Sequence, residues 1–183
     1  MNLVNALIEH KANNKSTTKL SGIEAPIRNA ANRKEDILQT IAQTLQEHPF
    51  LSHIKPEYLQ YYEECASIAT FKSGDYLVKE KGPADDFFLI RSGRVALDTF
   101  IAGRGPTNIQ YLTDGEVLGW SWLVEPHVWH FNALAVTPTE TIHLNGSRLK
   151  ELAEQDCGFG YDLMKRMVNV VGSRLRMTML QLK

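Results

Sequence analysis

Short, largely apolar runs separated by turns occupy the middle of the chain, from residue 67 to residue 145. The runs cover residues 68–71, 76–80, 87–91, 95–100, 109–112, 117–118, 133–136 and 141–144. Turn-forming pairs separate them, among them Ser73-Gly74 and Ser92-Gly93. Short strands punctuated by turns about every 8 to 12 residues are typical of an antiparallel sandwich or barrel. Glycines at the corners favour a jelly roll (a double-stranded β-helix), so we predict a mainly β fold with flanking helices.

Helical periodicity flanks this region on both sides. Upstream, apolar residues recur every three or four positions in a helix that begins near Arg33 and ends before Pro49. Pro56 suits the first turn of a second helix. Downstream, Ser147 is expected to cap a short helix that breaks around residues 157–160.

The final stretch of the chain predicts one long helix with an apolar seam. Apolar residues there recur in steps of three and four, which is a heptad pattern. The seam persists so far that we predict a homodimer formed through this helix, by Met164, Val168, Val171 and Leu175. The alternative is a helix folded back on its own sandwich. The basic residues beside the seam are assigned to its solvated face: Lys165, Arg166, Arg174 and Arg176.

These patterns divide the chain into three parts. Residues 1–33 are rich in Asn, Lys, Ser and Thr, which indicates a tail or linker with room for one short amphipathic helix at its start. Residues 34–160 form the jelly-roll domain with its helices, and residues 161–183 form the long helix.

Composition fits a globular protein and names no partner. The 183 residues are 43% hydrophobic, and 20 basic residues balance 21 acidic ones. A nucleic-acid binder more often shows a basic excess or stripe. Cys65 and Cys157 lie far apart and outside any metal-ligand spacing, as expected of reduced thiols. The sequence has neither an apolar run of about 18 residues nor a secretion signal, so we expect a cytoplasmic protein without a membrane partner.

Four stretches of the sequence carry a family resemblance. They are residues 48–51 (HPFL), 71–78 (FKSGDYLV), 82–95 (GPADDFFLIRSGRV) and 114–119 (DGEVLG). With these motifs in this order, residues 46–182 resemble the cyclic nucleotide-binding domain of the catabolite-activator and FNR (CRP/FNR) superfamily. The resemblance implies a regulatory role in signalling and a phosphate-binding cassette between Gly119 and Ala135.

The side chains of that cassette depart from the family's pattern. The cassette needs a glycine-led turn and an Arg for the cyclic phosphate, and a Glu for the ribose 2′-hydroxyl. By the resemblance, Trp120 stands in place of the Glu, His130 of the Arg, and Phe131 of the Ser or Thr that follows it. Residues 119–136 contain no Arg or Lys. A buried phosphate would remain uncompensated, so we do not expect cyclic AMP or cyclic GMP to bind in the usual way.

Aromatic residues replace the missing groups, and all three tryptophans of the chain lie in this segment. Rings and a titratable imidazole suit a pocket rebuilt for another small ligand. The candidate pocket residues are Gly119, Trp120, Ser121, Trp122, Leu123, His130, Phe131 and Asn132. One alternative is that the rings only fill the old pocket, which leaves a ligand-free interaction scaffold. A further alternative is a cyclic mono- or dinucleotide held by backbone amides and a protonated His130.

Other chemistries lack support in the sequence, and we expect neither a cofactor nor catalytic activity. His127 and His130 have no Cys or carboxylate cluster beside them that would complete a metal or haem site. The sequence also lacks clustered cysteines for an iron–sulfur centre and a G-x-S-x-G motif. Regulators that the chain resembles continue after the long helix into a helix-turn-helix domain, whereas this sequence stops at Lys183. We therefore expect no direct DNA binding, and a role in transcription would act through a partner.

Overall fold

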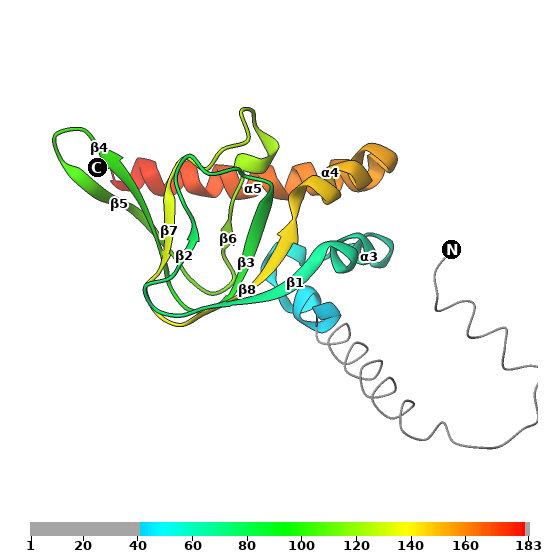
Figure 1. Cartoon of the computed structure of the whole chain (residues 1–183). Coiled ribbons are helices and arrows are strands. Elements are labelled where there is room, and N and C mark those ends of the chain that lie inside the picture. Colours follow the sequence, from blue (N-terminus) through cyan, green and yellow to red (C-terminus); the bar gives the residue numbers. More distant parts are fainter. Residues whose placement is uncertain (1–40, 182–183) are drawn as a thin grey trace, which may run out of the picture. The chain divides into compact units, whose positions relative to one another are not determined.

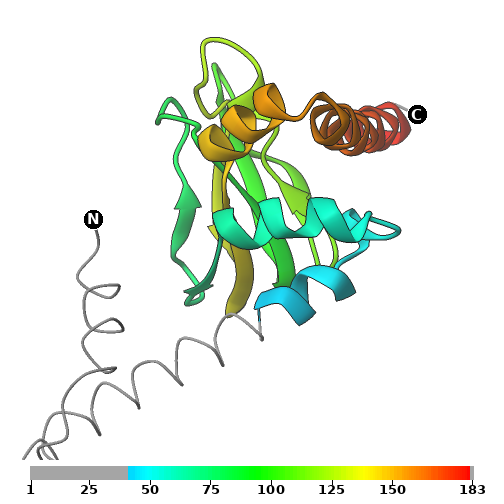
Figure 2. The ribbon, with the colours of Figure 1, turned by 90° about the vertical axis from the view of Figure 1, so that its right-hand side faces the viewer.

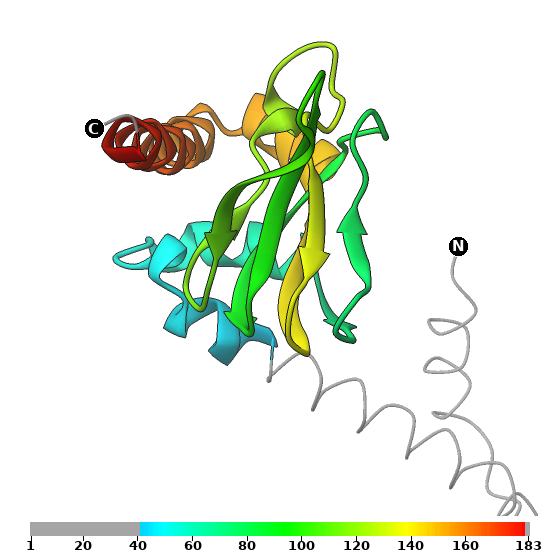
Figure 3. The ribbon, with the colours of Figure 1, turned by 90° about the vertical axis from the view of Figure 1, so that its left-hand side faces the viewer.

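Eight short strands form two antiparallel sheets in the computed structural model, which describes residues 41–181 (Figure 1). The strands are β1 (Ala66–Phe71), β2 (Tyr76–Val78), β3 (Asp86–Ser92), β4 (Val95–Ile101), β5 (Gly105–Leu112), β6 (Val117–Leu118), β7 (Asn132–Ala135) and β8 (Thr139–Asn145). One sheet has the order β1-β8-β3-β6. The other has the order β2-β7-β4-β5, and Figure 3 shows its strands side by side. The predicted mainly β jelly roll is confirmed.

Strand β3 separates two apolar clusters, because side chains alternate across a strand. Phe87 and Leu89 belong to a helix-side cluster that includes Phe50, Tyr62, Phe159 and Leu163. Phe88 and Ile90 belong to an inter-sheet cluster that includes Val78, Leu97, Leu112 and Trp129. All four of these β3 residues are at most 7% exposed. The unbroken apolar run in the sequence is therefore a strand with both faces covered.

Helices pack beside the first sheet at both ends of the described chain (Figures 1 and 2). Residues 41–47 are helical, and the 3-10 turn η2 (Pro49–Leu51) and helix α3 (Pro56–Cys65) follow. After the last strand come α4 (Gly146–Gln155) and α5 (Cys157–Gln181). The predicted tail at residues 1–33 and the predicted helix start near Arg33 lie outside the described residues.

Two element boundaries differ from the prediction. Strand β5 begins at Gly105 rather than at Ile109, because it pairs with β4 along its whole length. Helix α4 is capped by Asn145 rather than by Ser147. The Asn145 Oδ1 accepts a hydrogen bond from the Arg148 N–H at 2.8 Å, so the amide at the end of β8 already starts the helix.

The break before the long helix falls at Asp156, and its prediction at residues 157–160 is wrong. Asp156 Oδ1 accepts hydrogen bonds from the N–H groups of Gly158 and Phe159, at 2.9 and 3.0 Å, and so caps the first turn of α5. The glycines there serve packing instead. A Cβ on Gly158 would lie 2.6 Å from a tyrosine hydroxyl of α3, and one on Gly160 would lie 2.8 Å from a carbonyl oxygen of α4.

Helix α5 packs on its own domain with one face and leaves the other uncovered. Phe159 and Leu163 are fully buried and Met167 is 2% exposed, all three in the helix-side cluster. The seam residues of the predicted dimer lie beside this buried face rather than on it, and they are exposed by 40% to 68%: Met164, Val168, Val171 and Leu175. The helix thus folds back on the sandwich while its seam stays free in the described chain.

The basic residues of α5 divide between its two sides. Lys165 and Arg176 are exposed, as predicted. The prediction is wrong for Arg166 and Arg174, whose side chains are only 12% and 18% exposed. Arg166 pairs with Asp162 of the same helix and donates to the Phe50 carbonyl of η2, whereas Arg174 donates to the Val117 carbonyl of β6 and contacts Glu116 just before it.

Candidate functional site

The segment between β6 and β7 begins with the predicted glycine turn. Gly119 has a φ of +111°, a conformation that L side chains rarely adopt. A Cβ at this position would lie 2.8 Å from Cη2 of Trp129 and 3.0 Å from Cβ of Phe87. The 3-10 turn η3 (Ser121–Leu123) follows directly. Glycine is needed at position 119 both for the turn and for the ring that packs on it.

Trp129 fills the space between the two sheets. Its side chain is 4% exposed and lies in the inter-sheet cluster, with the ring of Phe131 at 6.0 Å between centroids. The backbone holds this position on both sides. The Trp129 N–H donates to the Gly82 carbonyl at 2.9 Å, and the Lys81 N–H donates to the Trp129 carbonyl at 2.8 Å. Trp129 was not among the predicted pocket residues, yet its ring packs against two of them, Gly119 and Phe131.

Trp122 and Leu123 lie on the other side of the first sheet. The Trp122 ring stacks on Phe87 with centroids 5.2 Å apart and an interplanar angle of 8°. Trp122 is 3% exposed and belongs to the helix-side cluster, and Leu123 packs against that cluster. Gly146 permits this arrangement, since a Cβ there would lie 2.7 Å from the Trp122 ring. The structure therefore places these two predicted pocket residues under α4.

The polar candidates form a second, shallower group. The rings of Trp120 and His130 stack with centroids 5.4 Å apart, and Ser121 Oγ lies 3.3 Å from His130 Nδ1. Ser121 is buried, whereas His130 is exposed. Asn132 uses its Oδ1 to accept a hydrogen bond from the Glu80 N–H at 3.0 Å. His130 thus lies at the surface, on the outer side of Trp120.

A cavity of about 200 Å³ remains where the predicted pocket residues meet α5. Gly119, Trp120 and Phe131 line it from the candidate segment. Leucines of β4, β5 and β6 form its apolar walls, and Arg174 and Thr178 close it from α5. Of the eight predicted pocket residues, these three are brought together around one space.

Arg174 is the cationic side chain of this cavity, and sequence reasoning missed it. Its Nη2 donates to the Val117 carbonyl at 2.7 Å, and its Nη1 lies 3.4 Å from Glu116 Oε1. Burial lowers the pKa of Arg174, and the charge of Glu116 offsets this in part. The helical spacing of the sequence could have identified Arg174 as a residue that faces the domain. Arg174 continues, in steps of three and four, the buried stripe of α5 formed by Leu163, Met167 and Val170.

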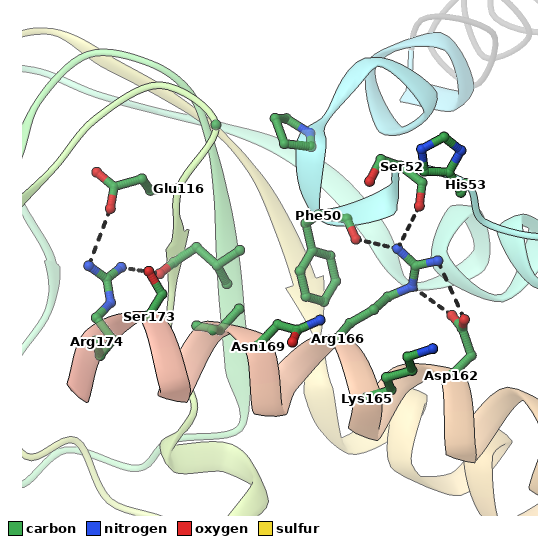
Figure 4. Close-up of a pocket in the computed structure, with 14 residues that line it drawn as sticks. Phe50, Ser52, His53, Glu116, Asp162, Lys165, Arg166, Asn169, Ser173 and Arg174 are labelled. Carbon is green, nitrogen blue, oxygen red and sulfur yellow. Dashed lines mark hydrogen bonds and ion pairs between the residues drawn. The ribbon is translucent and has the colours of Figure 1, made fainter. Parts of the chain in front are cut away.

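A larger hollow of about 480 Å³ lies between η2, the turn before β6 and α5 (Figure 4). At one end Arg166 pairs with Asp162 and donates to two backbone carbonyl oxygens of the η2 region. Arg174 stands at the other end. Asn169 and Ser173 line the middle and are exposed. Two arginine contacts, rather than continuous apolar packing, therefore hold this part of α5 to the domain.

His48 fixes the position of η2 beside this hollow. The His48 Nδ1 accepts from the Phe50 N–H at 3.2 Å, and Nε2 lies 3.3 Å from the Ile90 carbonyl oxygen, to which it donates. This pattern needs one protonated and one free ring nitrogen, which is the neutral imidazole. Burial lowers the pKa of His48, in agreement with a neutral ring. The predicted helix end before Pro49 is thus a hydrogen-bonded junction with β3.

Residues 41–181 contain neither a candidate metal-binding group nor a helix that could span a membrane. Within that range no group of three or more His, Cys, Asp or Glu side chains could hold a metal ion. None of the described helices has the length and apolar character required to cross a bilayer. His127 and His130 are accordingly not joined there by further metal ligands.

The two sheets, the glycine turn and the long closing helix define a double-stranded β-helix domain with a helix-capped pocket. Residues 68–156 match the family model described as the cyclic nucleotide-binding domain. The chain carries a cyclic nucleotide-binding domain, as its motifs predicted. A search of curated proteins found no match to the sequence.

Solved structures with this fold come from several kinds of protein. A Geobacter metallireducens protein described as cyclic nucleotide-binding is 26% identical and covers 70% of this chain and 92% of its own, with a TM-score of 0.62. The Thermus thermophilus catabolite activator protein is 21% identical. The match covers 73% of this chain and 61% of that protein, with a TM-score of 0.58. A third structure is the regulatory subunit of a cAMP-independent protein kinase A from Trypanosoma cruzi, bound to guanosine. It is 22% identical, and the match covers 73% of this chain and 47% of that subunit, with a TM-score of 0.60.

Proposed function

We propose that the chain is a non-enzymatic sensory module that binds a small molecule other than cyclic AMP or cyclic GMP and transmits binding through α5. The observation that carries this proposal is Trp129. Its ring occupies the interior between the sheets, 4% exposed, against the turn at Gly119. A nucleotide would have to displace this ring. In addition, residues 119–136 offer no side-chain cation to a cyclic phosphate.

The size of the remaining cavity supports the same proposal. Its volume is about 200 Å³. Pockets for drug-sized ligands usually measure roughly 300–1,000 Å³. The cavity therefore suits a compact ligand, stacked between Trp120 and Phe131, better than a whole nucleotide. The guanosine bound to the Trypanosoma cruzi protein supports the view that this fold takes ligands without a phosphate.

Helix α5 is the proposed output of the module. Arg166 and Arg174, on either side of Met167, hold it to the domain across a polar hollow. A helix attached by a few contacts can have two arrangements, and a ligand shifts it only by binding one of them better. We further propose that the exposed seam, with Val168 and Val171 at its centre, pairs with the same helix of a second copy.

A ligand-free scaffold is the second candidate, and the packing of Trp129 and Phe131 favours it. If the rings serve only to fill the interior, the domain would act through its exposed helix face alone. The two candidates differ in one measurable property, which is whether any small molecule stabilises the fold.

Thermal and chemical unfolding of the full chain with defined ligands tests the proposal. The panel contains cyclic AMP, cyclic GMP, cyclic dinucleotides, guanosine and fractions of a small-molecule cell extract. We expect no stabilisation by cyclic AMP or cyclic GMP, and stabilisation by at least one other compound. A ligand at a hundredfold its Kd would add about 2.7 kcal/mol. Stabilisation by cyclic AMP at neutral pH would overturn the proposal. Silence across the whole panel, with unchanged tryptophan fluorescence, would favour the scaffold instead.

A further inference from the structure

Arg174 is a partly buried cation whose hydrogen-bonding capacity is not used up. A guanidinium carries five N–H donors. In the described chain Arg174 makes one short bond, to the Val117 carbonyl at 2.7 Å, and one long contact, to Glu116 Oε1 at 3.4 Å. Charge-assisted bonds to carboxylates are usually about 2.7–2.9 Å long. Glu116 is also committed elsewhere, because its Oε2 accepts from the N–H and the hydroxyl of Thr113.

The charge on Arg174 is incompletely compensated at this position. Its side chain is 18% exposed. Burial lowers the pKa of Arg174 more than Glu116 raises it, which means that the charged form lacks part of the stabilisation it has in water. A second anion beside the guanidinium would restore that stabilisation.

The remainder of the cavity is apolar. Trp120 and Phe131 offer ring surfaces, leucines of three strands offer aliphatic walls, and only Gln110 and Thr178 add uncharged polar groups. The volume of the cavity is about 200 Å³. Such a space accepts a compact apolar body with one charged group at the α5 end.

We infer that the ligand of this cavity is a small organic carboxylate with an apolar body, and that Arg174 binds its carboxylate. This inference rests on the proposed function, since it names the ligand class for the same pocket. Arg174 and Thr178 both belong to α5, whereas the rings and leucines belong to the β domain. The bound carboxylate therefore joins the helix to the domain and strengthens the attachment of α5.

The test uses three carboxylates and their neutral amides as probes: benzoate, phenylacetate and hexanoate against benzamide, phenylacetamide and hexanamide. Binding to the full chain is measured by calorimetry and by thermal unfolding. We expect at least one carboxylate to bind about tenfold or more tightly than its amide. Arg174→Gln should remove that preference. Arg176→Gln, an exposed arginine two positions along the same helix, should retain it.

A second variant separates ligand binding from a purely structural role of Arg174. Glu116→Gln removes the competing carboxylate, so it should tighten carboxylate binding about threefold or more if Arg174 is the binding group. If Arg174 only ties α5 to β6, Glu116→Gln would leave carboxylate affinity unchanged or lower it, and the inference would be wrong. Failure of all three carboxylates to bind, or equal binding of the amides, would also overturn it. Neutral ligands that still bind elsewhere in the panel would leave the sensory proposal standing.

Discussion

The ring of Trp129 lies directly on the Cα of Gly119, at a distance that leaves no space for a side chain. A Cβ at position 119 would lie 2.8 Å from Cη2 of that ring. The turn that would face a phosphate in the resembled family thus faces an indole. This contact explains why the backbone of the cassette is retained while the space beside it is filled.

Gly119→Ala should destabilise the fold by about 2–6 kcal/mol. The substitution strains a residue at φ +111° and also forces a Cβ against the Trp129 ring, and each effect costs about 1–3 kcal/mol. Urea unfolding measures the loss. Gly103→Ala is the matched control, because Gly103 has φ +81° and a Cβ added there would have no atom within 4 Å. Its cost should be about 1 kcal/mol. Equal losses for the two variants would contradict the close Gly119–Trp129 contact.

Alanine substitutions should distinguish Trp129, which fills the space between the sheets, from Trp120, which is partly exposed. Trp129→Ala removes a ring that is 4% exposed, so it should cost about 3–5 kcal/mol. Trp120→Ala removes a partly exposed ring stacked on His130 and should cost clearly less. Chemical unfolding of both variants gives the comparison. We also expect Trp129→Ala not to bind cyclic AMP, since residues 119–136 still supply no Arg or Lys to the cyclic phosphate. Binding by this variant would show that only the ring blocks the nucleotide.

The apolar runs and the turn-forming pairs were sufficient to predict the strands. In a β-sandwich each strand needs apolar side chains on its buried face and a turn at its end, and both are visible in the local sequence. The fate of individual rings was not predictable in the same way. Trp122 and Trp129 are seven residues apart, yet they lie on opposite sides of the first sheet. Which side each takes depends on how the loop between them is bonded to residues 81–84, and those bonds join segments distant in sequence.

Charged residues of the helix show a second limit of sequence reasoning. Arg174 follows the buried stripe of Leu163, Met167 and Val170, but an arginine there reads as solvated unless an acceptor is known to face it. The acceptors are Glu116 and the Val117 carbonyl, the latter in a strand of two residues. The local sequence pattern predicts which face of α5 carries Arg174, whereas the groups that accept its hydrogen bonds are known only from the tertiary structure.

The pH dependence of stability should reveal how much the charged Asp156 cap of α5 stabilises the fold. The pKa of Asp156 lies below its ordinary value of 3.8, because its carboxylate accepts three hydrogen bonds. The bond from the Phe159 N–H contributes most, and those from the Gly158 N–H and the Tyr61 hydroxyl follow. Because the folded value is the lower one, the charged cap stabilises the fold above about pH 3.8, and this contribution is lost as the pH falls through the folded pKa. Asp156→Asn should therefore lower Tm at pH 7, and the difference from the parent should close in acid.

Asp85→Asn is the control for that measurement. It removes the same charge from an exposed residue whose carboxylate makes no hydrogen bond to the part of the chain that the structure describes. Its Tm should follow the parent across the same pH range. A gap for Asp156→Asn that stays constant down to about pH 2.5 would mean that the charge of the cap does not stabilise α5.

A single charge on the exposed seam should separate the proposed dimer. Val171 is 44% exposed in the single chain and lies between Val168 and Leu175 on the same face of α5. If two helices pair there, Val171→Glu would bury a carboxylate without a partner in each copy, which costs several kcal/mol. Sedimentation velocity should then show a dimer for the parent and a monomer for the variant. Asn169→Glu introduces the same charge on the side of α5 that faces the polar hollow, so it should remain dimeric. A parent that sediments as a monomer at micromolar concentration would contradict the proposed dimer. A Val171→Glu variant that stays dimeric would place the association elsewhere than on this seam.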